Sequence, residues 1–133
     1  MRHLFLVLSI VGLSAGAVQA KQKLRDVKLV DDAVFDVAVA DKIRKECPDI
    51  SARVLKALTL YRSVRSHARS LGFSDDEIEA YGDSDVEKAR MRKKGEAYLH
   101  ARGVVASDPQ SYCAVGRKEI QKSSRIGSLL REK

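Results

Sequence analysis

Cys47 and Cys113 are the only cysteines of the chain, and their chemistry depends on the compartment in which the protein folds. In an oxidising compartment two cysteines usually pair, and a bridge across these 66 positions would stabilise the fold by about 4 kcal/mol through loop closure. A redox-active or metal-binding pair is the alternative. The chain has no C-x-x-C motif, however, and two thiols with three scattered histidines make a poor zinc site. We therefore predict a structural disulfide between the two residues.

A dense group of acidic residues raises the question of metal binding or acid catalysis. Its members are Asp75, Asp76, Glu77, Glu79, Asp83, Asp85 and Glu87. A calcium-binding loop that began at Asp83 would need glycine at its sixth position and glutamate at its twelfth. Lys88 and Lys94 occupy those positions. Because helix N-termini favour negative charge, we expect most of these acids to stabilise the first turns of two helices rather than to hold a metal.

Three arginines at spacings of three and four, Arg62, Arg65 and Arg69, form a narrow stripe on a predicted helix. Such a stripe could bind an anionic group, for example the phosphates of lipopolysaccharide, lipid headgroups or an acidic protein. It could also be a solvated flank whose arginine stems cover apolar surface, which is the commoner role of a charged helix face. The three residues are a candidate anion-binding stripe.

Histidines are the remaining candidates for acid–base catalysis, and His67 and His100 are the two that lie beyond the first twenty residues. His67 lies at the edge of a polar helix face, and His100 lies in a basic neighbourhood near a predicted helix end. The sequence identifies no partner for either side chain. Beyond the first twenty residues, the motifs G-x-S-x-G and H-E-x-x-H and a phosphate-binding loop are absent from the sequence. We predict no catalytic residue, no cofactor and no metal ligand.

The first twenty residues differ from the rest of the chain and are typical of a cleavable signal peptide. Arg2 and His3 precede the apolar residues 4–13, and Val18 and Ala20 supply the small side chains that a signal peptidase requires. A membrane-spanning helix needs about 20 apolar residues, roughly twice the length of this stretch. We therefore predict cleavage after Ala20, no transmembrane anchor after cleavage, and a periplasmic product.

Charge and composition restrict the class of partner. The net charge is +7 for the whole chain and +6 without the leader, which contains one arginine and no acid. Such a charge would permit a nucleic-acid partner. The chain has no tryptophan, however, only 5% of its residues are aromatic, and a signal peptide argues against contact with nucleic acid. An acidic protein or an anionic envelope surface is the partner that we expect, and the sequence does not indicate an oligomeric state.

Beyond the leader we expect a flexible lead-in over residues 21–30 and a single helical domain over residues 31–133. Asp31 or Asp32 can cap a first helix whose inward residues recur every four positions. These inward residues are Phe35, Val39, Ile43 and Cys47. Residues 34–40 are rich in valine, which would also be compatible with a strand.

Capping signals divide the rest of the domain into further helices. Ser51 is the expected cap of a second helix, with an inward face formed by Val54, Leu58, Tyr61 and Ala68 and flanked by Ala57, Val64 and Leu71. Capping boxes, in which a serine precedes a glutamate by three positions, then open two helices at Ser74–Glu77 and at Ser84–Glu87. We expect the second of these helices to bury Val86, Ala89, Tyr98 and Leu99.

Two helix starts remain near the C-terminal end. Asp108 followed by Pro109 is a typical cap and first helical residue. Ile126, Leu129 and Leu130 suit a last short turn that packs on the body of the domain. Five to six helices joined by short polar turns predict a compact all-α bundle with one disulfide.

Several short motifs of the chain resemble a family of short exported proteins of alphaproteobacteria, classified as a domain of unknown function. The motifs are ADKIRK at residues 40–45 with Cys47, ISAR at 50–53, SDDEIEAY at 74–81, EKAR at 87–90, GEAYL at 95–99 and Ile126-Gly127. The resemblance covers most of the chain beyond the leader. It implies a helical periplasmic domain with paired cysteines, and it transfers no functional residue because the family has no assigned activity.

The sequence favours a non-catalytic binding or interaction module for an envelope protein or an anionic envelope component. Such a module predicts an apolar groove or a contiguous basic face. An unrecognised periplasmic enzyme is an alternative, and it predicts a concave pocket with titratable groups that converge around His67 or His100. A structural or stress-related envelope protein without a fixed ligand is the third hypothesis.

Overall fold

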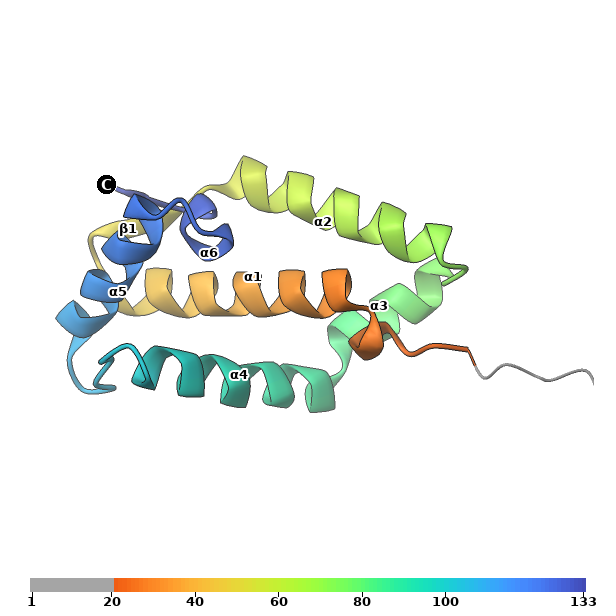
Figure 1. The fold of residues 1–133 in the computed structure, drawn as a ribbon, viewed down its shortest axis with the longest axis horizontal. Coiled ribbons are helices and arrows are strands. Elements are labelled where there is room, and N and C mark those ends of the chain that lie inside the picture. The colour runs from red at the N-terminus through yellow and green to blue at the C-terminus, as the bar shows by residue number, and fades with distance from the viewer. Residues whose placement is uncertain (1–20) are drawn as a thin grey trace, which may run out of the picture.

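The structure is a computed structural model that describes residues 21–133, so the predicted signal peptide lies outside the described residues. Within this range the chain forms six α-helices, one 3₁₀ turn and two short strands (Figure 1). They are η1 (Leu24–Asp26), α1 (Lys28–Glu46), β1 (Ile50–Ala52), α2 (Val54–Ser70), α3 (Asp75–Asp83), α4 (Asp85–His100), α5 (Pro109–Gln121), α6 (Arg125–Ser128) and β2 (Leu130–Glu132). The predicted all-α bundle of five to six helices with one disulfide is confirmed.

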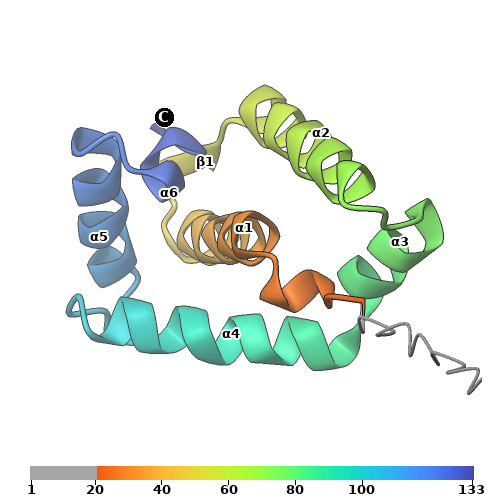
Figure 2. The ribbon, with the colours of Figure 1, turned by 45° about the vertical axis from the view of Figure 1, so that its right-hand side comes forward.

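Helix α1 is the central element. Figure 2 looks nearly along its axis and shows α2, α4 and α5 arranged around it. Val39, Ile43 and Cys47, which the four-residue spacing predicts to face inward, are no more than 1% exposed. Phe35 is partly buried and packs edge-to-face against Tyr98 of α4. The other helices therefore pack around α1.

The start of α1 differs from the prediction. The helix begins at Lys28 rather than beside Asp31 or Asp32, and no side chain caps its N-terminus. Asp31 accepts hydrogen bonds from Arg90 and Lys94 of α4 instead of capping the helix. The expected cap is thus used to hold α4 against α1.

The predicted flexible lead-in over residues 21–30 is packed against the domain in the structure. Leu24, Val27 and Val30 are buried, and they form a second core cluster with Ala68 and Phe73. Their spacing of three positions places all three on one side of η1 and of the first turn of α1. The regularly spaced apolar residues therefore pack this segment against the domain although most of its other residues are charged.

Strands β1 and β2 form an antiparallel pair in which Ser51 lies opposite Arg131. Ser51 is consequently part of a strand and does not cap α2, which begins at Val54 without a side-chain cap. Each strand has only three residues, which is too short for an alternating apolar pattern to be recognised in the sequence. The pair ties the C-terminal end of the chain to the connection between α1 and α2.

Helix α2 buries a different face from the predicted one. Val54, Leu58 and Tyr61 are 70%, 41% and 52% exposed, and Ala68 is the one buried residue of the predicted face. The partly buried apolar residues of the helix are Ala57 and Val64, which were predicted only to flank this face, together with Leu60. Both sets recur at spacings of three and four, so the periodicity of the sequence alone does not distinguish them.

The two serine caps around α3 are where the sequence predicts them. The Ser74 side chain accepts a hydrogen bond from the backbone N–H of Glu77, and the Glu77 carboxylate accepts one from the backbone N–H of Ser74. Ser84 accepts a hydrogen bond from the backbone N–H of Glu87 at the start of α4, but the Glu87 carboxylate pairs with Arg25 and Arg90 and does not complete the predicted second capping box. Local capping chemistry thus sets the boundaries of both helices.

Helix α4 faces α1 through residues that only partly match the prediction. Met91, Gly95 and Leu99 are buried, whereas Val86 and Ala89 are exposed. A Cβ atom on Gly95 would lie 3.4 Å from Cγ2 of Val39, so the glycine allows α4 to cross α1 closely. The contact face of α4 therefore lies toward the C-terminal end of the helix and does not include Val86 and Ala89 near its start.

Helices α5 and α6 complete the bundle. Asp108 accepts a hydrogen bond from the backbone N–H of Gln110 and Pro109 is the first residue of α5, as predicted. Ser124 caps α6 through the backbone N–H of Gly127. None of the helices in the described part of the chain has the length and apolar character needed to cross a membrane.

Candidate functional site

Helices α1 and α2, together with α6, border an open groove of about 710 Å³, which we call the α1–α2 groove. In Figure 1, α1 and α2 run side by side and α6 lies near the end where α2 begins. The apolar residues of the groove are Leu29, Ala33, Leu55, Leu60, Val64 and Leu129. The volume lies within the range of sites for small organic ligands.

An ion pair lies at the side of the groove where α6 meets α1. Arg125 of α6 places Nε 2.7 Å from Oδ2 of Asp36, whose side chain is 6% exposed, while its Nη1 lies 3.5 Å from Asp32. Burial raises the pKa of Asp36, and the nearby Arg125 guanidinium opposes only part of this effect. An apolar groove that contains a buried acid with a shifted pKa has the usual composition of a ligand site.

A second buried acid, Glu119 of α5, helps to position the helix that carries Arg125. Glu119 is 3% exposed and accepts hydrogen bonds from the hydroxyls of Tyr98 at 3.1 Å and Ser124 at 2.5 Å. Ser124 also caps α6, the helix that carries Arg125. The network therefore fixes α6 relative to α4 and α5 and so determines where Arg125 lies.

Gly127 is the residue that lets α6 approach α5 closely enough for this arrangement. A Cβ atom at this position would overlap the backbone carbonyl of Glu119. The glycine requirement thus comes from a close approach of two backbones and not from an unusual backbone conformation.

Lys56 of α2 also lines the groove. No acidic side chain within residues 21–133 forms an ion pair with it, whereas Arg125 is shared between Asp32 and Asp36. The Arg125 side chain is nevertheless 67% exposed. The groove therefore combines an apolar surface with an unpaired ammonium group and an accessible guanidinium group.

A family model for a family of unknown function, DUF5333, matches residues 22–131, from the segment before η1 into β2. The chain belongs to this family. The match confirms the resemblance to a domain of unknown function. A search of the curated proteins and a search of the solved structures each found no match.

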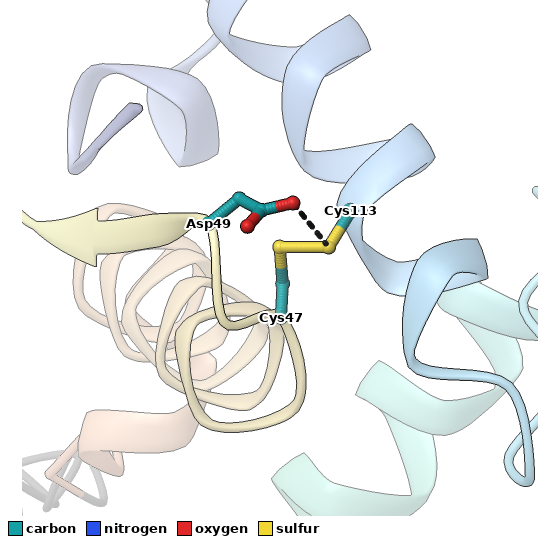
Figure 3. Close-up of side chains that lie close together, drawn as sticks. All are labelled: Cys47, Asp49 and Cys113. Carbon is teal, nitrogen blue, oxygen red and sulfur yellow. Dashed lines mark hydrogen bonds between the residues drawn. A yellow bond between two sulfur atoms is a disulfide. The ribbon is translucent and has the colours of Figure 1, made fainter. Parts of the chain in front are cut away.

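In this member of the family the two cysteines form the predicted disulfide, which ties the end of α1 to α5. Figure 3 shows the carboxylate of Asp49 beside the bridge, with Oδ2 4.0 Å from Sγ of Cys113 and 3.0 Å from the Arg117 guanidinium. The three side chains are close enough for a metal site in geometric terms. Because both sulfurs are bonded to each other and buried, they do not offer thiolate ligands, and we assign the bridge a structural role.

The three arginines of the candidate anion-binding stripe differ in their ion-pair partners. Arg69 forms a two-pronged ion pair with Asp75, and Arg65 contacts Asp75 and Glu79. Arg62 is exposed and forms no ion pair with residues 21–133. Two of the three charges are therefore used to hold α3 against α2, and the acids of α3 are their partners.

The two histidines lie away from the groove. His67 is partly exposed on α2, and His100 is exposed at the last residue of α4. Neither lines the α1–α2 groove. The converging titratable groups that the enzyme hypothesis requires are not found around these two side chains in the described residues.

Asp36, Glu119 and Arg125 are the site residues that sequence reasoning missed. Asp36 lies three positions before Val39 on the predicted inward stripe, and Glu119 lies four positions after the buried Val115. An acid on an apolar helix face is a recognisable signal, because unpaired acids are rarely buried. Arg125 has no comparable signal, since its role depends on how α6 approaches α1.

Proposed function

We propose that this protein is an exported, non-catalytic binding module that holds a single-chain amphiphile in the α1–α2 groove. The observation that carries the proposal is the groove itself, where apolar side chains from three elements meet a buried acid and two accessible cationic groups. A ligand that fits has an unbranched apolar chain and one anionic headgroup, as in a fatty acid or a lysophospholipid.

The apolar chain of the ligand lies along Ala33, Leu60 and Val64, which line the groove from α1 and α2. Removal of its surface from water supplies most of the affinity. The headgroup contacts Lys56, because the charge of Arg125 is already offset by Asp32 and Asp36. The guanidinium of Arg125 adds hydrogen-bond donors at its exposed edge.

The buried acids already have ion-pair or hydrogen-bond partners, and this favours binding over catalysis. Asp36 is paired with Arg125, and both carboxylate oxygens of Glu119 accept hydrogen bonds from hydroxyl groups. A general base needs a free lone pair directed at the substrate. These two carboxylates instead hold α1, α5 and α6 together.

Export to the periplasm is part of the proposal and rests on residues 1–20 together with the disulfide, which requires an oxidising compartment to persist. We expect the protein purified from its native cells to begin at Lys21. N-terminal sequencing of that material measures this directly, and a protein that begins at Met1 would contradict it.

Displacement of a fluorescent apolar anion, anilinonaphthalene sulfonate, by dodecanoate tests the groove. We expect Ser63→Trp, which places an indole into the groove from an exposed position of α2, to weaken dodecanoate binding by about tenfold or more. Ser66→Trp is the matched control, because Ser66 is exposed on the same helix and does not line the groove. Equal affinities of the two variants would contradict the proposal.

The headgroup is tested with a second variant, Lys56→Glu. We expect it to weaken dodecanoate binding by about fivefold, the equivalent of one exposed ion pair, and to leave the affinity for dodecanol unchanged. If Lys56→Glu weakened the binding of dodecanoate and of dodecanol equally, Lys56 would not contact the headgroup.

A further inference from the structure

The first half of α2 exposes four large apolar side chains within eight residues. Val54 and Leu55 are 70% and 80% exposed, and Leu58 and Tyr61 are 41% and 52% exposed. Val54, Leu58 and Tyr61 follow one another at spacings of four and three, so they share one side of the helix. We call the surface formed by Val54, Leu58 and Tyr61 the outer face of α2, and no element within residues 21–133 buries it. An apolar cluster of this kind on the surface is typical of an interaction site.

The charges on α2 itself are all positive, and the acids nearest the outer face, Asp75 and Glu79 of α3, are paired with Arg65 beside Tyr61. Helix α2 contains no aspartate or glutamate, and Arg53 immediately precedes it. Arg53, Lys56 and Arg62 form no ion pair with any residue in the described part of the chain. They differ in this from Arg65 and Arg69, whose charges are offset by α3. The apolar side chains are therefore flanked by cations that have no internal partner.

These charges favour one class of partner. In a symmetric dimer through the outer face, two acid-free basic helices would face each other, and like charges would oppose the contact. An anionic lipid surface offers negative headgroups to the arginines and, directly below them, an apolar layer to the exposed side chains. A basic helix with apolar residues on an accessible face is the usual composition of a helix that lies in a membrane interface.

We propose that the outer face of α2 docks on an anionic lipid surface, with Val54, Leu58 and Tyr61 in the interfacial layer and Arg53 and Arg62 at the headgroups. The docking is peripheral, since no helix of the described residues can span a bilayer. The inference stands apart from the amphiphile site, because none of the residues proposed to contact the lipid lines the α1–α2 groove. Leu55 and Lys56 do line it, and they are not part of the proposed contact.

Flotation of the purified protein with lipid vesicles tests the docking. We expect binding to vesicles of phosphatidylglycerol and phosphatidylcholine, about tenfold or more weaker binding to vesicles of phosphatidylcholine alone, and loss of binding in high salt. Equal binding to both kinds of vesicle, or no binding to either, would overturn the proposal.

Two pairs of matched variants locate the contact. Val54→Ser with Leu58→Ser should reduce vesicle binding about tenfold or more, whereas Val86→Ser with Val105→Ser removes two comparably exposed apolar residues elsewhere and should not. Folding of each variant is checked by its urea unfolding curve. If both pairs reduce binding equally, the outer face is not the contact.

The charge is tested with two double variants that lower the net charge by the same amount. Arg53→Gln with Arg62→Gln should weaken binding to the anionic vesicles, whereas Lys23→Gln with Lys93→Gln, which alters two exposed lysines away from α2, should have a much smaller effect. The groove variant Ser63→Trp should bind vesicles as the unaltered protein does. If sedimentation shows a dimer that Val54→Ser with Leu58→Ser abolishes while vesicle binding is unchanged, the outer face belongs to a second copy and the lipid proposal is wrong.

Discussion

Asp36 and Asp31 lie five residues apart on α1, and the fold shifts their pKa values in opposite directions. Burial raises the pKa of Asp36. Burial also acts on Asp31, but the hydrogen bonds from Arg90 and Lys94 outweigh it and lower the pKa of Asp31. The folded state therefore keeps a proton on Asp36 to a higher pH than the unfolded state, and loses the proton of Asp31 at a lower pH.

These shifts give opposite pH dependences of stability. The contribution of Asp36 to the free energy of unfolding falls as the pH rises from the ordinary pKa of aspartate through the raised value of the folded state. The contribution of Asp31 is present above the ordinary pKa and is lost as the pH falls through its lowered value. We expect Asp36→Asn to become more stable relative to the unaltered protein as the pH rises, and Asp31→Asn to become less stable.

Urea unfolding of the three proteins between about pH 3 and pH 7 measures both effects, and each variant is the control of the other. Slopes of the same sign for the two variants would show that the environments of Asp36 and Asp31 differ less than the structure indicates.

At the scale of elements, the position of α6 on α5 depends on Gly127. Because a Cβ atom there would overlap the carbonyl of Glu119, Gly127→Ala requires a backbone shift, and we expect it to lower the free energy of unfolding by about 3 kcal/mol. Because α6 carries Arg125, we expect the shift to disturb its contact with Asp36 at the groove and so to weaken dodecanoate binding.

Gly82→Ala in α3 is the matched control for this substitution. No atom lies within 4 Å of its added Cβ, and alanine is the better helix former, so a gain of up to about 1 kcal/mol is expected. Urea unfolding measures both variants. A Gly127→Ala variant as stable as the unaltered protein would mean that α6 does not pack as described.

The elements that the sequence predicted well are those with local signals. The caps at Ser74, Ser84 and Asp108 are set by hydrogen bonds within a few residues, and all three are found in the structure. The inward face of α2 and the β1–β2 pair depend on contacts between distant segments. Such contacts leave no periodic signal in a single sequence, so Ser51 could not be recognised as a strand residue.

At the scale of the whole molecule, the disulfide is the feature that the sequence predicted most directly. It links the end of α1 to α5 across 66 positions and so constrains the unfolded chain. We expect Cys47→Ala with Cys113→Ala to lower the free energy of unfolding by about 4 kcal/mol, a large share of the stability of a small domain.

Treatment of the protein with iodoacetamide in denaturant, with and without prior reduction, is the accompanying check on the bridge, because both sulfurs are buried in the folded protein. Both thiols should react only after reduction, and alkylation of either cysteine in the unreduced protein would contradict the paired state.

The α1–α2 groove is a property of the whole molecule as well, and the sequence predicted only that an apolar groove or a basic face would exist. Its walls come from α1, α2 and the segment around α6, so its position depends on a tertiary arrangement that includes α6, Gly127 and the buried Glu119. Its polar residues are spread from Asp36 to Arg125 in the sequence, and no motif connects them.

Backbone amide chemical shifts of the ¹⁵N-labelled protein during a titration with dodecanoate below its micelle concentration test the central claim most directly. The account predicts saturable shifts confined to residues that line the α1–α2 groove, including Ala33, Leu60, Val64 and Leu129. Saturable shifts centred instead on the hollow between α1 and α4, around Val34 and Met91, or no saturable shifts at all, would contradict it.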